Sequence, residues 1–355
     1  KVGQLQNIPL SLGLTILLVY LCELVHPGHP SFKVVTLLLL GMLPVYYRTL
    51  SLLRGEPFVA FFALLTVYWL LRMVRDGDYG LRASVRLGAA LGLLALSRQW
   101  GLMLYPAIAL WALVVLIRQR HAALPLGRAL TAAFALAAVV GGWFYLSLYL
   151  RFGTLTAFNM PPARTFSLAN QPPDFYLGLG DGLLFRDPTR PSFENQALPI
   201  LYADTWGDYW EYHLIRGDNQ RTLIPFLGRV AALSLYPTLI LVAGVLAGAA
   251  DLLRWPAWVG QGAPQAPGWR SLAALVVLVS LAGYAWFLIR YPHPRGATIK
   301  ATYILQVFPF AALLGADLLE WARSKRRWVW GVLLLLLVLV IGHNLPALVT
   351  HHAFE

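Results

Sequence analysis

The chain has 355 residues, of which 58% are hydrophobic and only 12% are charged, and its mean hydropathy is +0.62. Soluble domains carry about a quarter charged residues, so this composition excludes an ordinary soluble enzyme and predicts a membrane protein. The net charge of +12 does not indicate nucleic-acid binding, because much of the Lys and Arg lies in short segments between apolar blocks. The lone Cys22 lies inside an apolar block and excludes an internal disulfide.

Apolar blocks follow one another along the chain and predict ten helices. They lie near 8–25, 32–47, 57–74, 87–97, 100–117, 129–150, 229–249, 270–289, 302–319 and 328–345. Because such blocks cross roughly 30 Å of hydrocarbon as helices, the predicted fold class is an all-α polytopic membrane protein rather than a β-barrel. We expect six transmembrane helices in 1–150, an exported cap loop in 151–228, and four helices with a C-terminal tail in 229–355.

Positive side chains collect in alternate connections between the blocks, and this bias predicts the orientation. The loops near 72–86, 118–128, 254–270 and 323–327 are rich in Arg and Lys and are expected to be cytoplasmic. Arg outnumbers Lys by 24 to 4, as in GC-rich bacterial genomes. We therefore expect a bacterial cytoplasmic (inner) membrane protein with its active face toward the exterior or periplasm. The 8–25 helix then enters from outside, so we expect a further helix upstream of it.

The apolar run from Leu87 to Ile117 is interrupted only at 97–99. Its 31 residues make about 46 Å of helix, which is too long for one span and too short for two full passes with a turn. We therefore expect Arg98 to lie below the outer membrane surface, in a cavity walled by other helices. A charge at that depth costs about 2.5 to 3.5 kcal/mol and indicates a partner or ligand, although an Arg that snorkels to the headgroups is the alternative.

The cap loop contains the stretch LYADTWGDYWEYH at 201–213, which is dense in acids and aromatic rings. Asp204, Asp208 and Glu211 are spaced i, i+4 and i+7, so a helix over this stretch would place them on one face. Such acids could hold a hard cation, bind sugar hydroxyls or act as a general base, and aromatic rings suit the faces of a pyranose. The alternative is an interfacial helix whose Trp and Tyr form an aromatic belt.

Cations also gather on the predicted outer face. Arg54 and Glu56 precede the 57–74 helix, where Glu56 also suits the positive end of the helix dipole. Lys300 and Tyr303 begin the 302–319 helix, where snorkelling alone would explain the Lys. The cations that converge on this face are Arg54, Arg98, Arg290, Arg295 and Lys300, with His293. They suit an anionic lipid headgroup, because charge-assisted bonds to phosphate are strong.

Several segments, taken in order, resemble one family. They are RGEPFVAFFALLTVYWLLR, LGLLALSRQWGLMLYPAIAL, WFYLSLYLRFGTLTAFN, LPILYADTWGDYWEYH and TIKATYILQVFPFAALLGA. Their order and spacing resemble the bacterial membrane glycosyltransferases of family 39, which have the GT-C fold and include protein O-mannosyltransferases and lipid A aminoarabinose transferases. The resemblance extends over nearly the whole chain. It implies a GT-C-like helix bundle that transfers a sugar, with inversion, from a polyprenyl-phosphate donor to an acceptor on the exported face.

The resemblance also implies roles for residues. In that family the catalytic Asp lies in the first exported loop, after a first helix, whereas this chain resembles the family from the second helix onward. The candidates for catalysis are therefore Glu56, Asp204 and Asp208. The candidates for binding the donor phosphate are Arg54, Arg98, Lys300 and Tyr303. No Walker loop, dinucleotide fingerprint or Cys/His metal set occurs, and no divalent metal is predicted. We expect the pairs His26/His29 and His351/His352 to lie at the membrane interface.

Two other classes of protein stay open. A catalytically inert GT-C-like subunit of a larger membrane complex would share the fold without the chemistry. A lipid or sugar transporter would show inverted repeats and broken helices that meet at the midplane, whereas here no repeat is visible and the polar residues gather at one face. The expected partners are membrane lipid, a lipid-linked sugar and an unspecified acceptor, with further membrane subunits in the second case and no nucleic acid.

Overall fold

The computed structural model describes residues 5–118, 120–156, 162–163, 165–212, 220–253 and 268–349. Every regular element in these ranges is a helix. The longer helices are α1 (Asn7–Val25), α2 (Pro30–Gly41), α3 (Pro44–Ser51), α4 (Glu56–Asp76), α5 (Leu81–Ser97), α6 (Leu104–Arg118), α7 (Arg120–Phe152), α9 (Ala197–Trp206), α10 (Gln220–Leu253), α11 (Trp269–Arg290), α12 (Val307–Lys325) and α13 (Arg327–Val349). The short ones are η2 (Gln99–Met103), η3 (Leu168–Asn170), α8 (Pro173–Leu177), η4 (Leu183–Phe185) and η6 (Ala301–Ile304).

Seven of the described helices are long and apolar enough to cross a membrane, which fits the predicted polytopic class. They are α1, α4, α6 together with η2, α7, α10, α11 and α13, and the bent pair of α2 and α3 would make an eighth if it is one span. α5 has only 17 residues, and α12 carries acids and bases in its second half. Seven of the ten predicted crossings, or eight with the bent pair, therefore meet this length and composition, and every predicted block does form helix.

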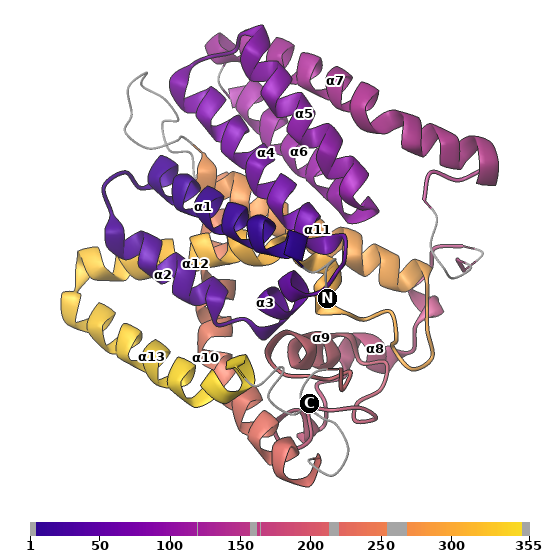
Figure 1. Ribbon diagram of the computed structural model, residues 1–355, viewed down its shortest axis with the longest axis vertical. Coiled ribbons are helices and arrows are strands. Elements are labelled where there is room, and N and C mark those ends of the chain that lie inside the picture. Colours follow the sequence, from indigo (N-terminus) through magenta and orange to yellow (C-terminus); the bar gives the residue numbers. More distant parts are fainter. Residues whose placement is uncertain are drawn as a thin grey trace.

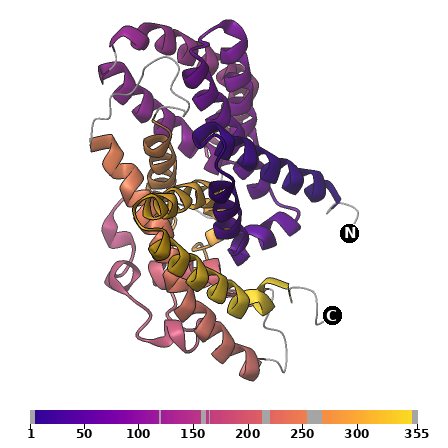
Figure 2. The same ribbon diagram turned by 90° about the vertical axis from the view of Figure 1, so that its left-hand side faces the viewer.

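Two groups of helices make up the bundle. α4, α5, α6 and α7 form the first group, and α10, α12 and α13 form the second (Figure 1). α1 packs on α4, α2 packs on α12, and α11 contacts α6, α10 and α12, so these three helices join the groups. The two groups are also distinct from the side (Figure 2). The apolar core extends through both, with Phe32, Trp111 and Phe310 fully buried.

The predicted helix at 32–47 is broken into α2 and α3, whose axes differ by 74°. Pro44 causes the break, because a proline disfavours helical backbone at the preceding residue. Leu43 is accordingly extended, with φ −82° and ψ 108°, and Pro44 occupies the first turn of α3. The bend carries α3 beside α9 and η6, where it becomes one wall of a pocket.

The cap between α7 and α10 consists of short helices and loops that dock on the end of α11. The last carbonyls of a helix have no partner within the helix. Here the Gln171 side-chain amide donates to Leu288 O at 2.7 Å, Asn170 donates to Ile289 O at 3.2 Å, and the backbone N–H of Ala163 donates to Arg290 O at 2.8 Å. The cap is thereby fixed to one end of the bundle.

Candidate functional site

The acid-rich stretch of the cap is only partly helical. α9 ends at Trp206, Gly207 has φ −124° and ψ −138°, and Glu211 has a positive φ of 57°. Asp204 is therefore on the helix, whereas Asp208 and Glu211 follow it in turns. The expectation that the three acids share one helical face is wrong, because Gly207 ends the helix before the second acid. His213 lies outside the described residues.

The aromatic rings of this stretch are buried in the protein. Trp206, Tyr209 and Trp210 are almost fully inaccessible. The indole of Trp206 donates to Thr238 Oγ1 on α10 at 2.9 Å, and that of Trp210 donates to Ile299 O at 3.1 Å. These contacts contradict the alternative of an interfacial aromatic belt. The rings instead hold the acids against α10 and the segment before η6.

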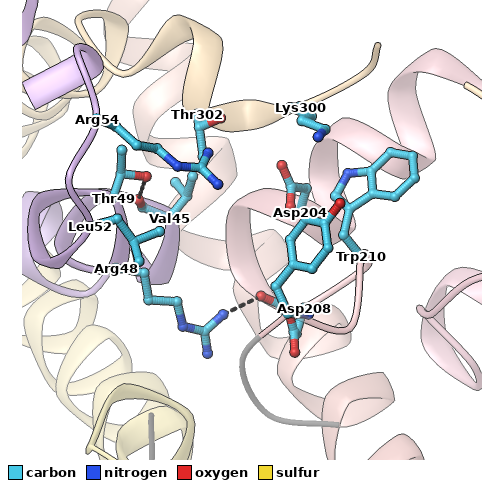
Figure 3. A pocket seen from close by; sticks show the side chains of 12 residues that line it. Val45, Arg48, Thr49, Leu52, Arg54, Asp204, Asp208, Trp210, Lys300 and Thr302 are labelled. Carbon is cyan, nitrogen blue, oxygen red and sulfur yellow. Dashed lines mark hydrogen bonds between the residues drawn. The ribbon is translucent and has the colours of Figure 1, made fainter. Parts of the chain in front are cut away.

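A pocket lies where α3, α9 and the segment before η6 meet, and it encloses about 410 Å³ of empty space including its mouth. Small-molecule sites usually measure about 300 to 1,000 Å³ by a measure that leaves out open solvent. By that measure this pocket has a volume of about 30 Å³, so it is narrow. Figure 3 shows Arg48 and Arg54 extending from one side toward Asp204, Asp208, Trp210 and Lys300 on the other. Four of the predicted site residues, Arg54, Asp204, Asp208 and Lys300, thus line one pocket.

Arg48 on α3 is a pocket residue that the sequence analysis did not single out. Its side chain is buried, with 3% exposed, and it donates to Gly207 O at 2.6 Å and to Ala347 O at 3.0 Å. No ion pair links it to a carboxylate in the described part of the chain, and its Nε has no hydrogen-bond partner there. The available signal was a single Arg between Tyr47 and Thr49 in an apolar region, where a cation marks a functional site by default.

Arg54 and Lys300 add two further positive charges to the pocket. The Lys300 ammonium lies 5.6 Å from the ring centroids of both Trp210 and Tyr212, within the range of cation–π attraction. Neither Arg54 nor Lys300 forms an ion pair with a described residue. Three cations therefore face two carboxylates, and the pocket retains the donors that an anionic ligand requires.

Asp204 is a pocket carboxylate whose pKa is raised by its surroundings. Burial raises its pKa to about 6, with a contribution from Asp208, although the backbone N–H of Ala301, donating at 2.6 Å, and the charge of Lys300 favour the ionised form. Asp208 is 2% exposed and accepts the backbone N–H of Tyr212 at 3.0 Å. Asp204 can therefore take up and release a proton near neutral pH, as a general base must.

Glu56 and Arg98 form an ion pair with each other at the start of α4 and the end of α5. The Glu56 side chain is 2% exposed and its Oε2 has no hydrogen-bond partner among the described residues, whereas the Arg98 side chain is 44% exposed. Arg98 does have the partner that the sequence predicted. The side chain is half-exposed, and its position in a cavity below the outer membrane surface stays a prediction. Neither residue lines the pocket of Arg54.

The remaining predicted residues of this end have structural contacts. Tyr303 stacks on Trp100, with ring centroids 5.3 Å apart, and faces the rings of η2 and α11 rather than the pocket. Arg290 donates to Ala163 O, and His293 Nδ1 accepts the backbone N–H of Arg295 at 3.2 Å. These four residues therefore do not join the cations of the pocket.

No group of three or more His, Cys, Asp or Glu side chains in the described ranges is placed to hold a metal ion. Comparisons of the chain with protein-family models, curated proteins and solved structures found no match. The features that indicate a function are therefore the geometry of the pocket and its place at one end of an apolar helix bundle.

Proposed function

We propose that this protein is an integral-membrane glycosyltransferase that moves a sugar from a polyprenyl-phosphate donor to an acceptor hydroxyl on the exported face. One observation carries the proposal. Arg54 and Lys300, without carboxylate partners in the described part of the chain, converge with Asp204 and aromatic rings in one pocket of an apolar bundle. This combination suits a phosphate, a sugar and a lipid tail together.

In the proposed reaction, the acceptor oxygen attacks the anomeric carbon while the bond from that carbon to the phosphate oxygen breaks. Asp204 takes the acceptor proton, and polyprenyl phosphate leaves with the electron pair of the broken bond. Negative charge grows on the leaving phosphate, so Arg54 and Lys300 stabilise the transition state more than the ground state. The half-exposed Tyr212 covers an apolar face of the sugar, and the buried Arg48 joins α3 to Gly207 and Ala347 through its hydrogen bonds.

A catalytically inert subunit with a lipid-binding pocket is the second candidate, and a specific observation favours it. Asp204 already accepts a short hydrogen bond from Ala301, and Glu56 is paired with Arg98. These two candidate bases, like Asp208 with the N–H of Tyr212, thus have contacts that a purely structural carboxylate would also have. Binding of the donor without transfer would be the signature of this alternative.

The test uses the full chain in nanodiscs and measures binding of polyprenyl phosphate and release of sugar from a panel of polyprenyl-phosphate sugars. Each of Arg54→Gln and Lys300→Gln removes one charge-assisted bond to phosphate, and we expect polyprenyl phosphate to bind about tenfold more weakly. Asp204→Asn should bind polyprenyl phosphate like the wild type and should lose transfer by about 100-fold or more, the usual contribution of a general base.

Arg295→Gln is the matched control for the binding arm, because Arg295 is exposed near the same end of the bundle but does not line the pocket. Equal weakening by Arg295→Gln would mean that general surface charge attracts the lipid. Undiminished sugar transfer by the Asp204→Asn variant would exclude Asp204 as the general base. Tight binding with no transfer from any donor in the panel would favour the inert subunit.

A further inference from the structure

A second polar pocket lies at the other end of the bundle. α1 begins beside the first pocket, where the Asn7 side chain donates to Leu52 O at 2.9 Å, and ends 19 residues later next to His26. At 1.5 Å per residue the two ends of α1 are about 28 Å apart. His26, the start of α11, the second half of α12 and the start of α13 enclose about 910 Å³ of empty space including the open mouth.

The acids of this second pocket are already neutralised by partners in its walls. Asp317 Oδ1 lies 2.8 Å from His26 Nε2 and accepts from Arg270 at 2.8 Å, while its Oδ2 lies 2.8 Å from Arg270 Nε. Glu320 pairs with Arg323 at 3.0 Å. His26 is buried among these partners at the end of α1, and its position at the membrane interface stays a prediction. These carboxylates brace α1, α11 and α12 and do not present free ligands for a cation.

Positive charge is in excess at the mouth of the second pocket. Three arginines line it, Arg270, Arg323 and Arg327, against two carboxylates, and Asp251, outside the lining, lies 3.7 Å from Arg270. The excess at the mouth is therefore the charge of Arg327. Arg327 and the neighbouring His29 are exposed, and neither has an ion-pair partner among the described residues. The pocket is therefore suited to an anion rather than to a metal ion, with Arg327 as the donor that is free to reach it.

An exposed aromatic ring marks where the mouth opens. Trp321 lines the pocket with 58% of its surface exposed, at the end of a helix that packs in the apolar bundle. Trp side chains prefer the level of lipid headgroups, and basic pockets between membrane helices bind phosphorylated headgroups. A phosphate presented from the membrane would thus reach the arginines directly, with the Trp ring beside its glycerol and upper acyl carbons.

We propose that this second pocket binds the phosphate of an anionic membrane lipid, at a site separate from the one assigned to the glycosyl donor. The lipid phosphate accepts hydrogen bonds from Arg327 and Arg323. The Asp317–Arg270 ion pair fixes α12 relative to α11 and so maintains the shape of the pocket. A soluble phosphate would satisfy the same guanidinium groups, but the exposed Trp321 at the mouth favours a ligand with an apolar part. The proposal does not depend on the activity of the first pocket.

Native mass spectrometry of the full chain in detergent tests the proposal with short-chain phosphatidylglycerol, phosphatidylcholine of the same chain length, and inorganic phosphate. We expect the wild type to retain phosphatidylglycerol at least tenfold more tightly than either of the others. Arg327→Gln should weaken phosphatidylglycerol binding about tenfold, which corresponds to about 1.4 kcal/mol. Arg327 has no ion-pair partner among the described residues, so the Arg327→Gln variant should fold normally. His29→Gln changes a second exposed residue of the lining, and we expect it to weaken phosphatidylglycerol binding less than Arg327→Gln does.

Lys325→Gln is the matched control, because it removes the same charge from the same turn at a residue that does not line the pocket. Its phosphatidylglycerol binding should change by less than about twofold. Equal losses in Arg327→Gln and Lys325→Gln would overturn the site in favour of diffuse surface attraction. Equal retention of phosphatidylcholine, or tighter binding of inorganic phosphate, would overturn the assignment to an anionic lipid.

Discussion

The carboxylate of Asp204 costs the folded protein free energy when it is ionised. Its pKa is about 6 in the folded state against an ordinary value of 3.8, chiefly because burial removes water from the charge. The folded state therefore holds the proton more tightly than the unfolded state does. Stability falls as the pH rises from about 4 to about 6 and is constant above that window. A residue kept at such a cost is typical of a functional site.

Asp204→Asn should consequently stabilise the protein above pH 6, by on the order of 2 to 3 kcal/mol. The Asn oxygen can still accept the Ala301 N–H, while the buried charge is gone. Melting temperatures of the purified protein at pH 4.5, 5.5 and 7.5 measure the effect, and the gain should grow with pH. Asp174→Asn, at an exposed carboxylate of the cap, should bring no such gain. A loss of stability in Asp204→Asn at pH 7.5 would contradict the account.

The Glu56–Arg98 ion pair, unlike the ionised Asp204, stabilises the folded state, because its opposite charges attract each other. Arg98→Gln would leave the buried Glu56 carboxylate without its cation, and we expect a loss of about 2 kcal/mol, moderated by the half-exposed position of Arg98. Glu56→Gln/Arg98→Gln together should recover most of that loss, since no unpaired charge remains. A double-mutant cycle of melting temperatures measures the coupling. Additive single losses would show that the two side chains do not interact in solution.

Residue types and positions predicted part of the site in advance. Arg54 and Lys300 were expected as cations at helix ends, and both line the pocket with Asp204. Arg48 was missed because its role depends on the bend before α3, which brings it to Gly207, 159 positions later in the chain. Tyr303 was expected at the donor phosphate, but its packing against Trp100 comes from tertiary contacts that spacing does not encode.

Small residues determine the closest helix contact in the first group. Gly88 and Gly92 are four positions apart on α5 and face α7, the arrangement that lets membrane helices approach closely. A Cβ at Gly88 would lie 2.6 Å from Ala133 O, and one at Gly92 would lie 2.5 Å from Val140 Cβ. Both approaches are shorter than real carbon contacts, so the two backbones would have to separate.

Gly88→Ala should therefore destabilise the protein by about 1 to 3 kcal/mol despite the better helix propensity of alanine. The close contact is with backbone, which cannot move aside as a flexible side chain would. Gly142→Ala on α7 is the control, because its nearest neighbour is Ala138 Cβ at 4.0 Å, and it should be neutral or slightly stabilising. Melting temperatures in one detergent compare the two variants. A neutral Gly88→Ala would mean that α5 and α7 are more loosely packed than the structure has them.

Helix positions were predictable at this scale because each block is apolar over its whole length, whereas helix breaks were not. The block at 8–25 corresponds closely to α1, with no competing signal. Pro44 and Gly207 each interrupt a segment that was expected to be continuous, and in both cases the break brings a side chain to the pocket. Arg48 follows the first break and Asp208 follows the second. The apolar blocks predict the helices, but Pro44 and Gly207, where helices break or end, determine which side chains reach the first pocket.

Two polar pockets formed by the described residues lie at opposite ends of an apolar bundle. α1, α11 and α12 extend from the neighbourhood of the first pocket toward the second. The positive-inside rule assigns the loops at Arg270 and Arg327 to the cytoplasm, so the cap and the first pocket are expected outside. Such an arrangement would separate the proposed transfer site from the proposed lipid site by the thickness of the membrane.

Cysteine labelling tests this orientation directly, because Cys22 is buried and is the only cysteine of the chain. In a Cys22→Ala background, Thr165→Cys adds a thiol to the exposed cap, and Lys325→Cys adds one to the exposed turn beside the second pocket. A membrane-impermeant maleimide applied to intact cells should label Thr165→Cys almost completely and Lys325→Cys only after permeabilisation, since the charged reagent does not cross lipid. Both thiols should react equally in detergent, which controls for local burial. If only Lys325→Cys were labelled in intact cells, the first pocket would face the cytoplasm. The first pocket could then not transfer a sugar on the exported face, even if it binds polyprenyl phosphate.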